Sequence, residues 1–214
     1  MIKAFDIKKE FLHPTYAEVL KGISLEIKGG LNIISGRSGS GKTTLMNVLS
    51  GLDKATSGKV LIDRTDISYL SKTTLDRFRR ENIGFVFQSV ALLSQFNAYE
   101  NVALMQRLIG KAEDRNLILN LFEEFGLLGK ENRSTTELSG GEQQRIAIIR
   151  AIINKPKIIF ADEPTAQLDF ASSQQVAQIF NKLSKDTTII MTTHDNEILS
   201  FADKILKIED GILV

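Results

Sequence analysis

Short apolar runs alternate with longer amphipathic segments along most of this 214-residue chain. Ile23, Leu25 and Ile27 alternate with polar residues, a period of two that predicts a half-buried strand ending at the turn Gly29-Gly30. Short apolar runs elsewhere predict further strands. They cover residues 31–35, 59–63, 83–87, 157–161, 188–191 and 204–208.

Between the strands, apolar residues recur every three or four positions, which predicts helices. One predicted helix covers 43–50 and ends before Gly51, and a second covers 142–154. A third includes Val176, Ile179, Phe180 and Leu183. Strands that alternate with helices indicate an α/β fold with a mainly parallel sheet. Consecutive helices are expected between 97 and 125, the first with a capping box of Asn97 and Glu100, the last ended by Gly126. They would form a helical sub-domain inserted into the α/β core.

Composition narrows the class of protein. The chain has 27 basic and 26 acidic residues, so it lacks the basic excess of a nucleic-acid-binding surface, and no nucleic-acid partner is expected. Cysteine is absent, which excludes disulfides and thiolate metal sites. No apolar run approaches the roughly 20 residues that cross a bilayer, and residues 1–10 carry no apolar signal core. We therefore expect one domain that forms no translocation path by itself.

A phosphate-binding loop stands between the predicted strand 31–35 and the helix that follows it. Its residues are Gly36, Arg37, Ser38, Gly39, Ser40, Gly41, Lys42 and Thr43, which fit the pattern G-x-x-x-x-G-K-[ST]. Glycines allow backbone N–H groups to surround phosphate oxygens, and the helix start favours the same anion. The alternative is a Gly/Ser-rich turn without function. Such a turn needs neither a strand before it nor a helix after it, whereas the sequence predicts both here.

Two carboxylates follow the apolar strand 157–161. In open parallel sheets, ligands bind at the carboxyl ends of strands. A P-loop enzyme needs an aspartate that holds Mg²⁺ and a group that orients or deprotonates water, and Asp162 and Glu163 suit these roles. Adjacent strand residues point to opposite faces, but this rule relaxes at the strand end, so both side chains can reach one site. The alternative is a strand that runs out to solvent.

A second glycine-containing helix start lies at Leu138–Arg145. Ser139 and Glu142 have capping-box spacing. That box does not explain Gly140 and Gly141, since each glycine costs about 1 kcal/mol relative to alanine within a helix. Paired glycines are useful where another backbone or a phosphate approaches closely. The chain thus carries two helix starts suited to phosphate.

Leu138–Arg145 resembles the signature motif of ABC ATPases, and the loop 36–43 and the strand ending at Asp162 resemble their Walker A and Walker B motifs. The resemblance covers essentially the whole chain and is strongest to the lipoprotein-releasing and macrolide-export (LolD/MacB-like) subfamily. Further segments support it, namely Leu52-Asp53, Thr56–Gly58, Ile83–Gln88, Glu100–Val102 and Ala161–Thr165.

The resemblance implies roles for individual residues. Glu163 corresponds to the catalytic glutamate, His194 to the switch histidine and Gln88 to the Q-loop glutamine, while Thr43, Gln88 and Asp162 would hold Mg²⁺. ATP would contact the P-loop, Thr44 after it, and Asp169 of the D-loop. Ser139, Gly140, Gly141 and Glu142 would serve the ATP site of the opposite subunit. Phe11 falls where the family stacks an aromatic ring on adenine, although Tyr16 is near and Phe11 could serve packing alone.

The implied organisation is a core of residues 1–88 and 139–214, with an antiparallel β sub-domain near the N-terminus, and a helical sub-domain at about 89–138. The implied function is ATP hydrolysis as a homodimer, with ATP and Mg²⁺ as cofactors, which drives a separate membrane permease. Export of peptide, lipoprotein or drug-like cargo is expected, from a cytoplasmic position on the inner face of the cell membrane.

Three departures from the family pattern remove no catalytic group, and the second of them, in the coupling surface, leaves the fine assignment of the membrane partner open. Ala166-Gln167 stands where relatives often begin with a smaller residue, Leu92–Asn97 lacks the usual Pro and Thr, and Ile149 replaces a small residue. Other members of the family are alternatives to a transporter subunit. DNA-repair ATPases carry long coiled-coil insertions between the Q-loop and the signature motif, whereas only residues 89–137 separate these motifs here. Ribosome-associated members carry two cores per chain. A cell-division regulator that pairs with a membrane protein without transport stays open.

Overall fold

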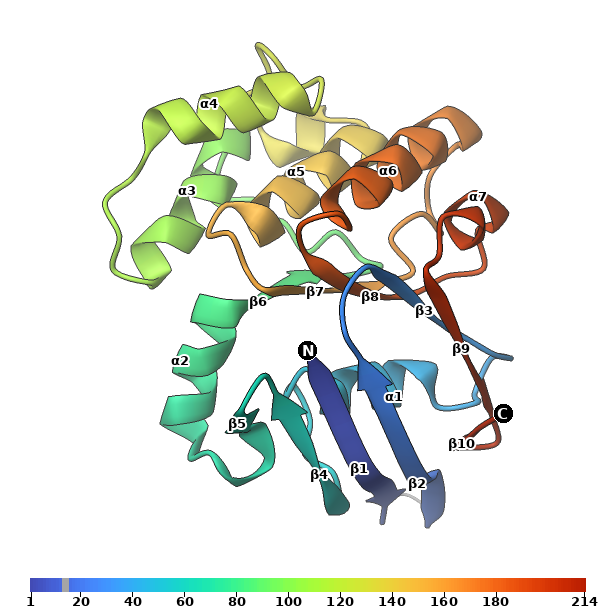
Figure 1. Ribbon diagram of the computed structural model, residues 1–214. Coiled ribbons are helices and arrows are strands. Elements are labelled where there is room, and N and C mark those ends of the chain that lie inside the picture. Colours follow the sequence, from blue (N-terminus) through green and yellow to red (C-terminus); the bar gives the residue numbers. More distant parts are fainter. Residues whose placement is uncertain (13–15) are drawn as a thin grey trace.

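The computed structural model describes residues 1–12 and 16–214 (Figure 1). A six-stranded sheet crosses the middle of the molecule in the order β10-β9-β3-β8-β7-β6. Neighbouring strands from β9 to β6 are parallel, and β10 joins the edge antiparallel to β9. The strands are β3 (Leu31–Ser35), β6 (Ile83–Val86), β7 (Ile158–Asp162), β8 (Thr188–Thr192), β9 (Lys204–Glu209) and β10 (Ile212–Leu213). The predicted α/β class with a mainly parallel sheet is confirmed.

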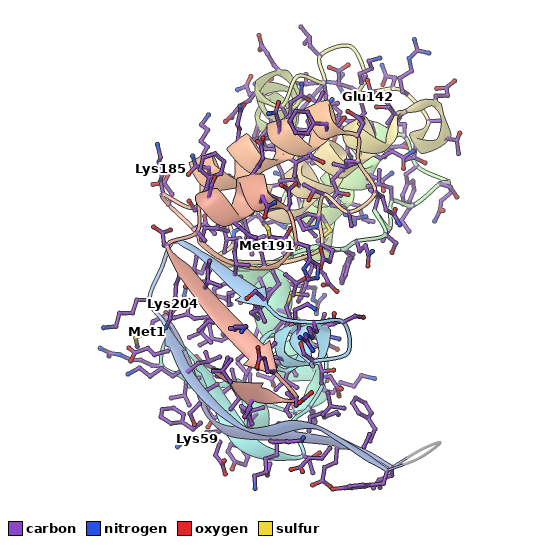
Figure 2. The ribbon with its side chains drawn as sticks, turned by 90° about the vertical axis from the view of Figure 1, so that its right-hand side faces the viewer. Met1, Lys59, Glu142, Lys185, Met191 and Lys204 are labelled. Carbon is purple, nitrogen blue, oxygen red and sulfur yellow. The ribbon has the colours of Figure 1, made fainter. Side chains whose placement is uncertain are left out.

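Alternation along the sheet strands divides the apolar interior in two, since successive side chains leave opposite faces. Ile159 and Ala161 pack with the helices on one face, whereas Ile158 and Phe160 pack toward α1 on the other. Both faces of the sheet are therefore covered, which explains why its strands read as continuous apolar runs. Figure 2 shows the layers side-on, with Met191 in the sheet, Glu142 among the helices and Lys59 on the opposite layer.

The second sheet is antiparallel, in the order β2-β1-β4-β5, and lies across α1 from the first (Figure 1). Its strands are β1 (Ile2–Phe11), β2 (Ala17–Ile27), β4 (Ser57–Ile62) and β5 (Thr65–Asp66). This confirms the antiparallel β sub-domain near the N-terminus. β1 is not among the strands predicted from the pattern. Its buried residues Ile2, Ala4 and Ile7 lose strict alternation where the pairing register shifts between Ala4 and Ile7.

The helices fall close to the predicted positions. They are α1 (Lys42–Leu49), α2 (Lys72–Asn82), α3 (Ala98–Leu108), α4 (Arg115–Glu124), α5 (Gly140–Ile152), α6 (Phe170–Leu183) and α7 (Asn196–Ser200), with 3₁₀ turns η1 (Ile67–Tyr69) and η2 (Thr135–Glu137). Asn97 and Glu100 form the expected capping box, and Gly51 and Gly126 adopt positive φ after α1 and α4.

One helix prediction needs correction, and two helices were missed. α5 begins at Gly140 rather than Glu142 and ends at Ile152, because Ser139 is the residue that caps it. α2 and α7 were not predicted, since α2 buries only Leu75 fully and α7 is a single short turn. Throughout residues 1–12 and 16–214, every helix is too short or too polar to span a bilayer.

Candidate functional site

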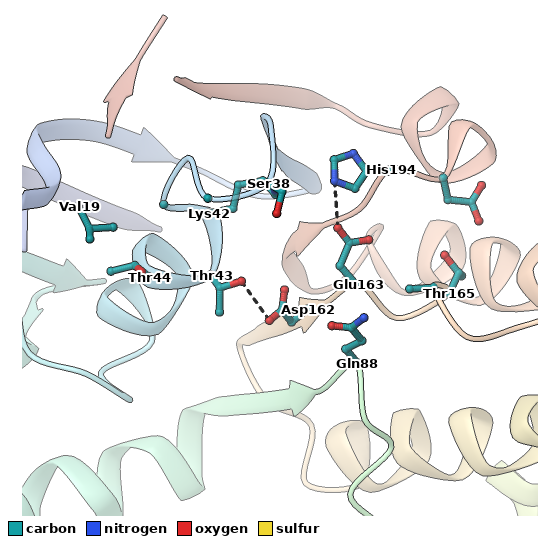
Figure 3. Close-up of a pocket in the computed structure, with 14 residues that line it drawn as sticks. Val19, Ser38, Lys42, Thr43, Thr44, Gln88, Asp162, Glu163, Thr165 and His194 are labelled. Atoms are coloured by element: carbon teal, nitrogen blue, oxygen red, sulfur yellow. Dashed lines mark hydrogen bonds and ion pairs between the residues drawn. The ribbon is translucent and has the colours of Figure 1, made fainter. Parts of the chain in front are cut away.

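A pocket of about 690 Å³ opens at the carboxyl ends of β3, β7 and β8, beside the start of α1 (Figure 3). Residues from five separate parts of the chain line it: Val19; Ser38, Gly39, Gly41, Lys42, Thr43 and Thr44; Gln88; Asp162, Glu163, Thr165 and Ala166; His194 and Asp195. The sheet topology assembles this site, because parallel strands place their carboxyl ends at one edge.

The loop 36–43 needs its glycines for two different reasons. Gly36, Gly39 and Gly41 all have positive φ, a conformation that side chains disfavour. A Cβ on Gly36 would in addition lie 2.2 Å from the carbonyl oxygen of Ile208, so the loop packs tightly against β9. Lys42 Nζ donates to the carbonyls of Gly36 and Arg37, at 2.9 and 3.0 Å, which holds the ammonium within the loop.

The start of α1 is suited to bind an anion. In the described part of the chain, α1 alone among the seven α-helices begins without a side-chain cap. Its N-cap is Gly41, whose backbone φ is 104°. The first N–H groups of a helix lack partners within it, and an anion can satisfy them together with the helix dipole. With Lys42 beside them, these donors gather N–H groups and one positive charge at the start of α1.

Asp162 and Thr43 form a small oxygen cluster next to the start of α1. Thr43 Oγ1 lies 3.4 Å from Asp162 Oδ2, although the two residues are far apart in sequence. Among the described residues, no group of three or more His, Cys, Asp or Glu side chains could hold a metal. One carboxylate and one hydroxyl fit Mg²⁺, which commonly binds through few protein oxygens together with substrate phosphates.

Glu163 reaches the same pocket as Asp162 because the backbone turns sharply between them. Its φ is 44°, in the left-handed region, which costs a residue with a Cβ about 1–3 kcal/mol. The backbone N–H of Glu163 donates to the carbonyl oxygen of Thr192 at 2.9 Å, which holds the turn. The expectation that both acids reach one site is thereby met, and the positive φ is the physical reason.

The Glu163 carboxylate contacts a histidine that follows the neighbouring strand β8. His194 Nε2 lies 3.4 Å from Glu163 Oε1 (Figure 3). The His194 side chain is 63% exposed, so its ring stands at the pocket mouth, whereas the Glu163 side chain is 19% exposed. Gln88, just beyond the end of β6, lines the pocket on the side of Asp162 and Glu163 (Figure 3). The pocket therefore offers a carboxylate that can accept a proton from water, with the Gln88 amide and the His194 imidazole around it.

Three predicted regions do not line this pocket. Asp169 caps α6 through the backbone N–H of Ser172 at 3.0 Å, and this bond lowers the pKa of its carboxyl group. The Phe11 ring is 40% exposed and faces the ammonium of Lys9, which lies 4.8 Å from its centroid. The glycine-containing start of α5 also lies outside the pocket lining.

The start of α5 has the predicted capping box. Ser139 Oγ accepts from the backbone N–H of Glu142 at 3.3 Å, and the Glu142 carboxylate accepts from that of Ser139 at 2.9 Å. The latter bond, with Lys130 nearby, holds the pKa of Glu142 below its usual value.

The two glycines of this start differ in their surroundings. A Cβ on Gly141 would lie 2.4 Å from Ser172 Oγ, whereas one on Gly140 would meet only Leu168 Cδ2, at 3.9 Å. Within one chain, the close approach at Gly141 is therefore to the side chain of Ser172 in α6. The close approach expected from sequence was to a backbone or a phosphate.

Several pocket residues had no sequence signal that marked them individually. Val19 is an unremarkable strand residue, and Ala166 and Asp195 are loop residues. Thr165 follows the two acids and is 6% exposed, and its polar side chain at a buried position is visible only in the fold. Thr165, Ala166 and Asp195 stand within three residues of Glu163 or His194 in sequence, whereas Val19 stands near neither.

Comparison with known proteins places this geometry in context. The family model described as "ABC transporter" matches residues 20–166. The chain is 42% identical over 203 residues to the lipoprotein-releasing system ATP-binding protein LolD of Aquifex aeolicus, covering 92% of this chain and 90% of that protein. It is 46% identical over 219 residues to the macrolide export ATP-binding/permease protein MacB of Campylobacter fetus, all of this chain but 34% of that protein. The chain thus spans about a third of the length of the MacB relatives.

Among solved structures, the fold is similar to the ATP-binding cassette MJ0796. A dimeric post-hydrolysis state of that protein bound to ADP and Pi superposes with a TM-score of 0.91 at 35% identity, covering 100% of this chain and 96% of that one.

Proposed function

Because this chain belongs to the ABC transporter family, we propose that it binds and hydrolyses ATP as the motor of a LolD/MacB-type exporter. The observation that carries this proposal is the pocket itself. It joins an uncapped helix start and Lys42 to the acids Asp162 and Glu163. Phosphate donors and a water-activating carboxylate at one edge of a parallel sheet are the parts that nucleotide hydrolysis requires.

The binding half of the site acts through charge and directed donors. The backbone N–H groups at Gly41 and the Lys42 ammonium would hold the phosphate chain of ATP, with Ser38, Gly39 and Thr44 around it. Mg²⁺ would neutralise charge on the phosphates. Thr43 and Asp162 would hold it, and Gln88 is within the same pocket lining. The proposed ligands are oxygen atoms, as this ion prefers.

The hydrolytic half acts on water. The Glu163 carboxylate would accept a hydrogen bond from the attacking water and take its proton as the water oxygen bonds to the γ-phosphorus. The bond from that phosphorus to the bridging oxygen would break at the same time, and ADP would leave with this oxygen. His194 would donate toward the γ-phosphate from the pocket mouth, and Gln88 would orient the water from the other side. Catalysis would consist mostly of positioning and electrostatic stabilisation.

Dimer formation would complete each site. The signature segment Ser139–Glu142 and Asp169 lie outside the pocket lining of their own chain, so they are available to a second copy. Two chains placed head to tail would each cover the ATP of the other with the start of α5. The relative MJ0796 has been solved as a dimer bound to ADP and Pi. ATP would hold the two copies together, and loss of phosphate would release them.

A permease would dock beside Gln88. A groove of about 300 Å³ there has apolar walls from β6, α3 and α5, including Phe85, Phe87 and Met105. Phe87 is 36% exposed and adjoins Gln88 in sequence, so an inserted helix of the permease would sense the nucleotide site. The MacB relatives are named as ATP-binding/permease proteins. The proposed location is the cytoplasmic face of the cell membrane, and the proposed cargo is a peptide, lipoprotein or drug-like molecule.

The proposed sub-domains and site residues follow the same division. Residues 1–88 and 139–214 would act as the core that binds ATP, and about 89–138 as the part that moves with the permease. Phe11 would stack on adenine with the ring face that Lys9 leaves open.

The test is Glu163→Gln, which keeps the shape of the side chain and removes its basicity. ATP binding by calorimetry should be unchanged, hydrolysis should fall by about 100-fold or more, and ATP should shift the protein to a dimer in size-exclusion chromatography. The control is Lys42→Ala/Glu163→Gln, which should not dimerise with ATP. Hydrolysis by Glu163→Gln at the wild-type rate would refute the assigned role.

A further inference from the structure

Thr192, the last residue of β8, is fully buried beside the site but does not line the pocket. It pairs with Asp162 across the β7–β8 ladder. Ile189, Ile190 and Met191 precede it, all buried and apolar. A buried hydroxyl in such a strand is costly unless it is hydrogen-bonded, so its partners reveal what it does.

The hydroxyl of Thr192 contacts both consecutive acids. It donates to Asp162 Oδ1, because an ionised carboxylate can only accept. The backbone N–H of Glu163 is shared between two acceptors, the Thr192 carbonyl oxygen at 2.9 Å and Thr192 Oγ1 at 3.1 Å. The hydroxyl thus donates a hydrogen bond to the Asp162 carboxylate and accepts one from the Glu163 backbone.

The two contacts act on different features of the site. The bond to Oδ1 fixes the rotation of the Asp162 carboxylate, so that Oδ2 is the oxygen that faces Thr43. The bond from Glu163 N–H to Oγ1 adds to the carbonyl bond that holds the turn at positive φ, and this turn directs the Glu163 side chain into the pocket. Such a conformation persists only when the surrounding structure holds it.

We propose that Thr192 is a positioning residue that sets the metal-holding oxygen of Asp162 and the direction of Glu163 together. It touches neither nucleotide nor water, and acts through the two acids. This proposal rests on the proposed ATP hydrolysis. It implies that one hydroxyl, on the strand that leads to His194, positions both the carboxylate that holds the ion and the carboxylate that activates water.

Thr192→Val tests the proposal, since valine keeps the shape and removes the hydroxyl. Loss of a hydrogen bond to a charged group should lower kcat by about 10- to 100-fold. The Mg²⁺ concentration for half-maximal binding of a fluorescent ATP analogue should rise several-fold, while binding of the analogue in EDTA stays unchanged. Thr192→Ser retains the hydroxyl and should restore both values to within about threefold of wild type.

Thr188→Val is the matched control, a hydroxyl removed at the opposite end of the same strand, where Thr188 pairs with Ile158. It should leave kcat and the Mg²⁺ response unchanged. The proposal is overturned if Thr192→Val keeps a wild-type Mg²⁺ response. It is also overturned if kcat falls in proportion to melting temperature in the same way in Thr192→Val, Thr192→Ser and Thr188→Val. If wild type itself hydrolyses no ATP, the proposed function fails, and the Mg²⁺-dependent binding assay still decides the role of Thr192.

Discussion

Gly140 and Gly141 stand side by side in the first turn of α5, yet the structure predicts opposite responses to alanine. At Gly141, a Cβ would lie 2.4 Å from Ser172 Oγ and 2.8 Å from Ser172 Cβ, distances that real Cβ atoms do not show. Ser172 cannot easily withdraw, because its backbone N–H and hydroxyl both bond to Asp169. At Gly140, the nearest atom would be Leu168 Cδ2 at 3.9 Å, an ordinary contact.

The magnitude follows from these distances. Alanine is favoured over glycine in a helix by up to about 1 kcal/mol, and this gain applies to both positions. Overpacking in a closely packed contact costs about 1–3 kcal/mol, and only Gly141→Ala incurs it. The two variants should therefore differ by about 1–3 kcal/mol in the free energy of unfolding, with Gly140→Ala equal to wild type or more stable.

Urea unfolding followed by circular dichroism measures this difference. Ser172→Gly removes both clashing atoms, so Gly141→Ala should cost less in that background than in wild type, a coupling that a double-mutant cycle detects. Equal stability of the two alanine variants, or no coupling with Ser172, would refute the packing explanation. Gly141 would then be required by a contact made outside the single chain.

The remaining predictions concern nucleotide, dimer and pH. Lys42→Ala should abolish ATP binding, because the ammonium that the loop carbonyls hold is lost; unchanged affinity in calorimetry would exclude the phosphate site. Ser139→Arg should block hydrolysis and ATP-dependent dimerisation while binding to one chain survives, and normal cooperativity would contradict a shared site. Glu142→Gln should be less stable than wild type at neutral pH, and this difference in the free energy of unfolding should disappear in acid. The native pKa of Glu142 is lowered by the Ser139 N–H, so its stabilisation is full above the unfolded pKa of about 4.3 and disappears as pH falls through the native value. A deficit independent of pH in urea titrations would contradict this.

The sequence by itself determined the features that depend on neighbours within a few residues. Capping boxes at Asn97 and Ser139, the stop at Gly51 and the strand 31–35 are all present as predicted. Caps and turns form between residues two to four positions apart, and buried parallel strands read as apolar runs because both of their faces are covered. The P-loop was readable for the same reason, since loop and helix start are contiguous.

Local pattern was insufficient where the pairing of distant segments sets the structure. β1 was missed because shifts in its register break the alternation of its buried residues. The start of α5 is a different case, because the capping box at Ser139 is local and places the first helical residue at Gly140, two residues before the predicted start.

The tertiary structure alone decided how these local pieces act together. Thr43 and Asp162 meet across 119 residues, and Thr192 meets Asp162 across 30, because the order and register of β3, β7 and β8 align their ends. The reason for Gly141 is likewise a contact with another helix. Sequence could name the chemical groups, but only the sheet register could show which hydroxyl supports both acids and which glycine is required by packing.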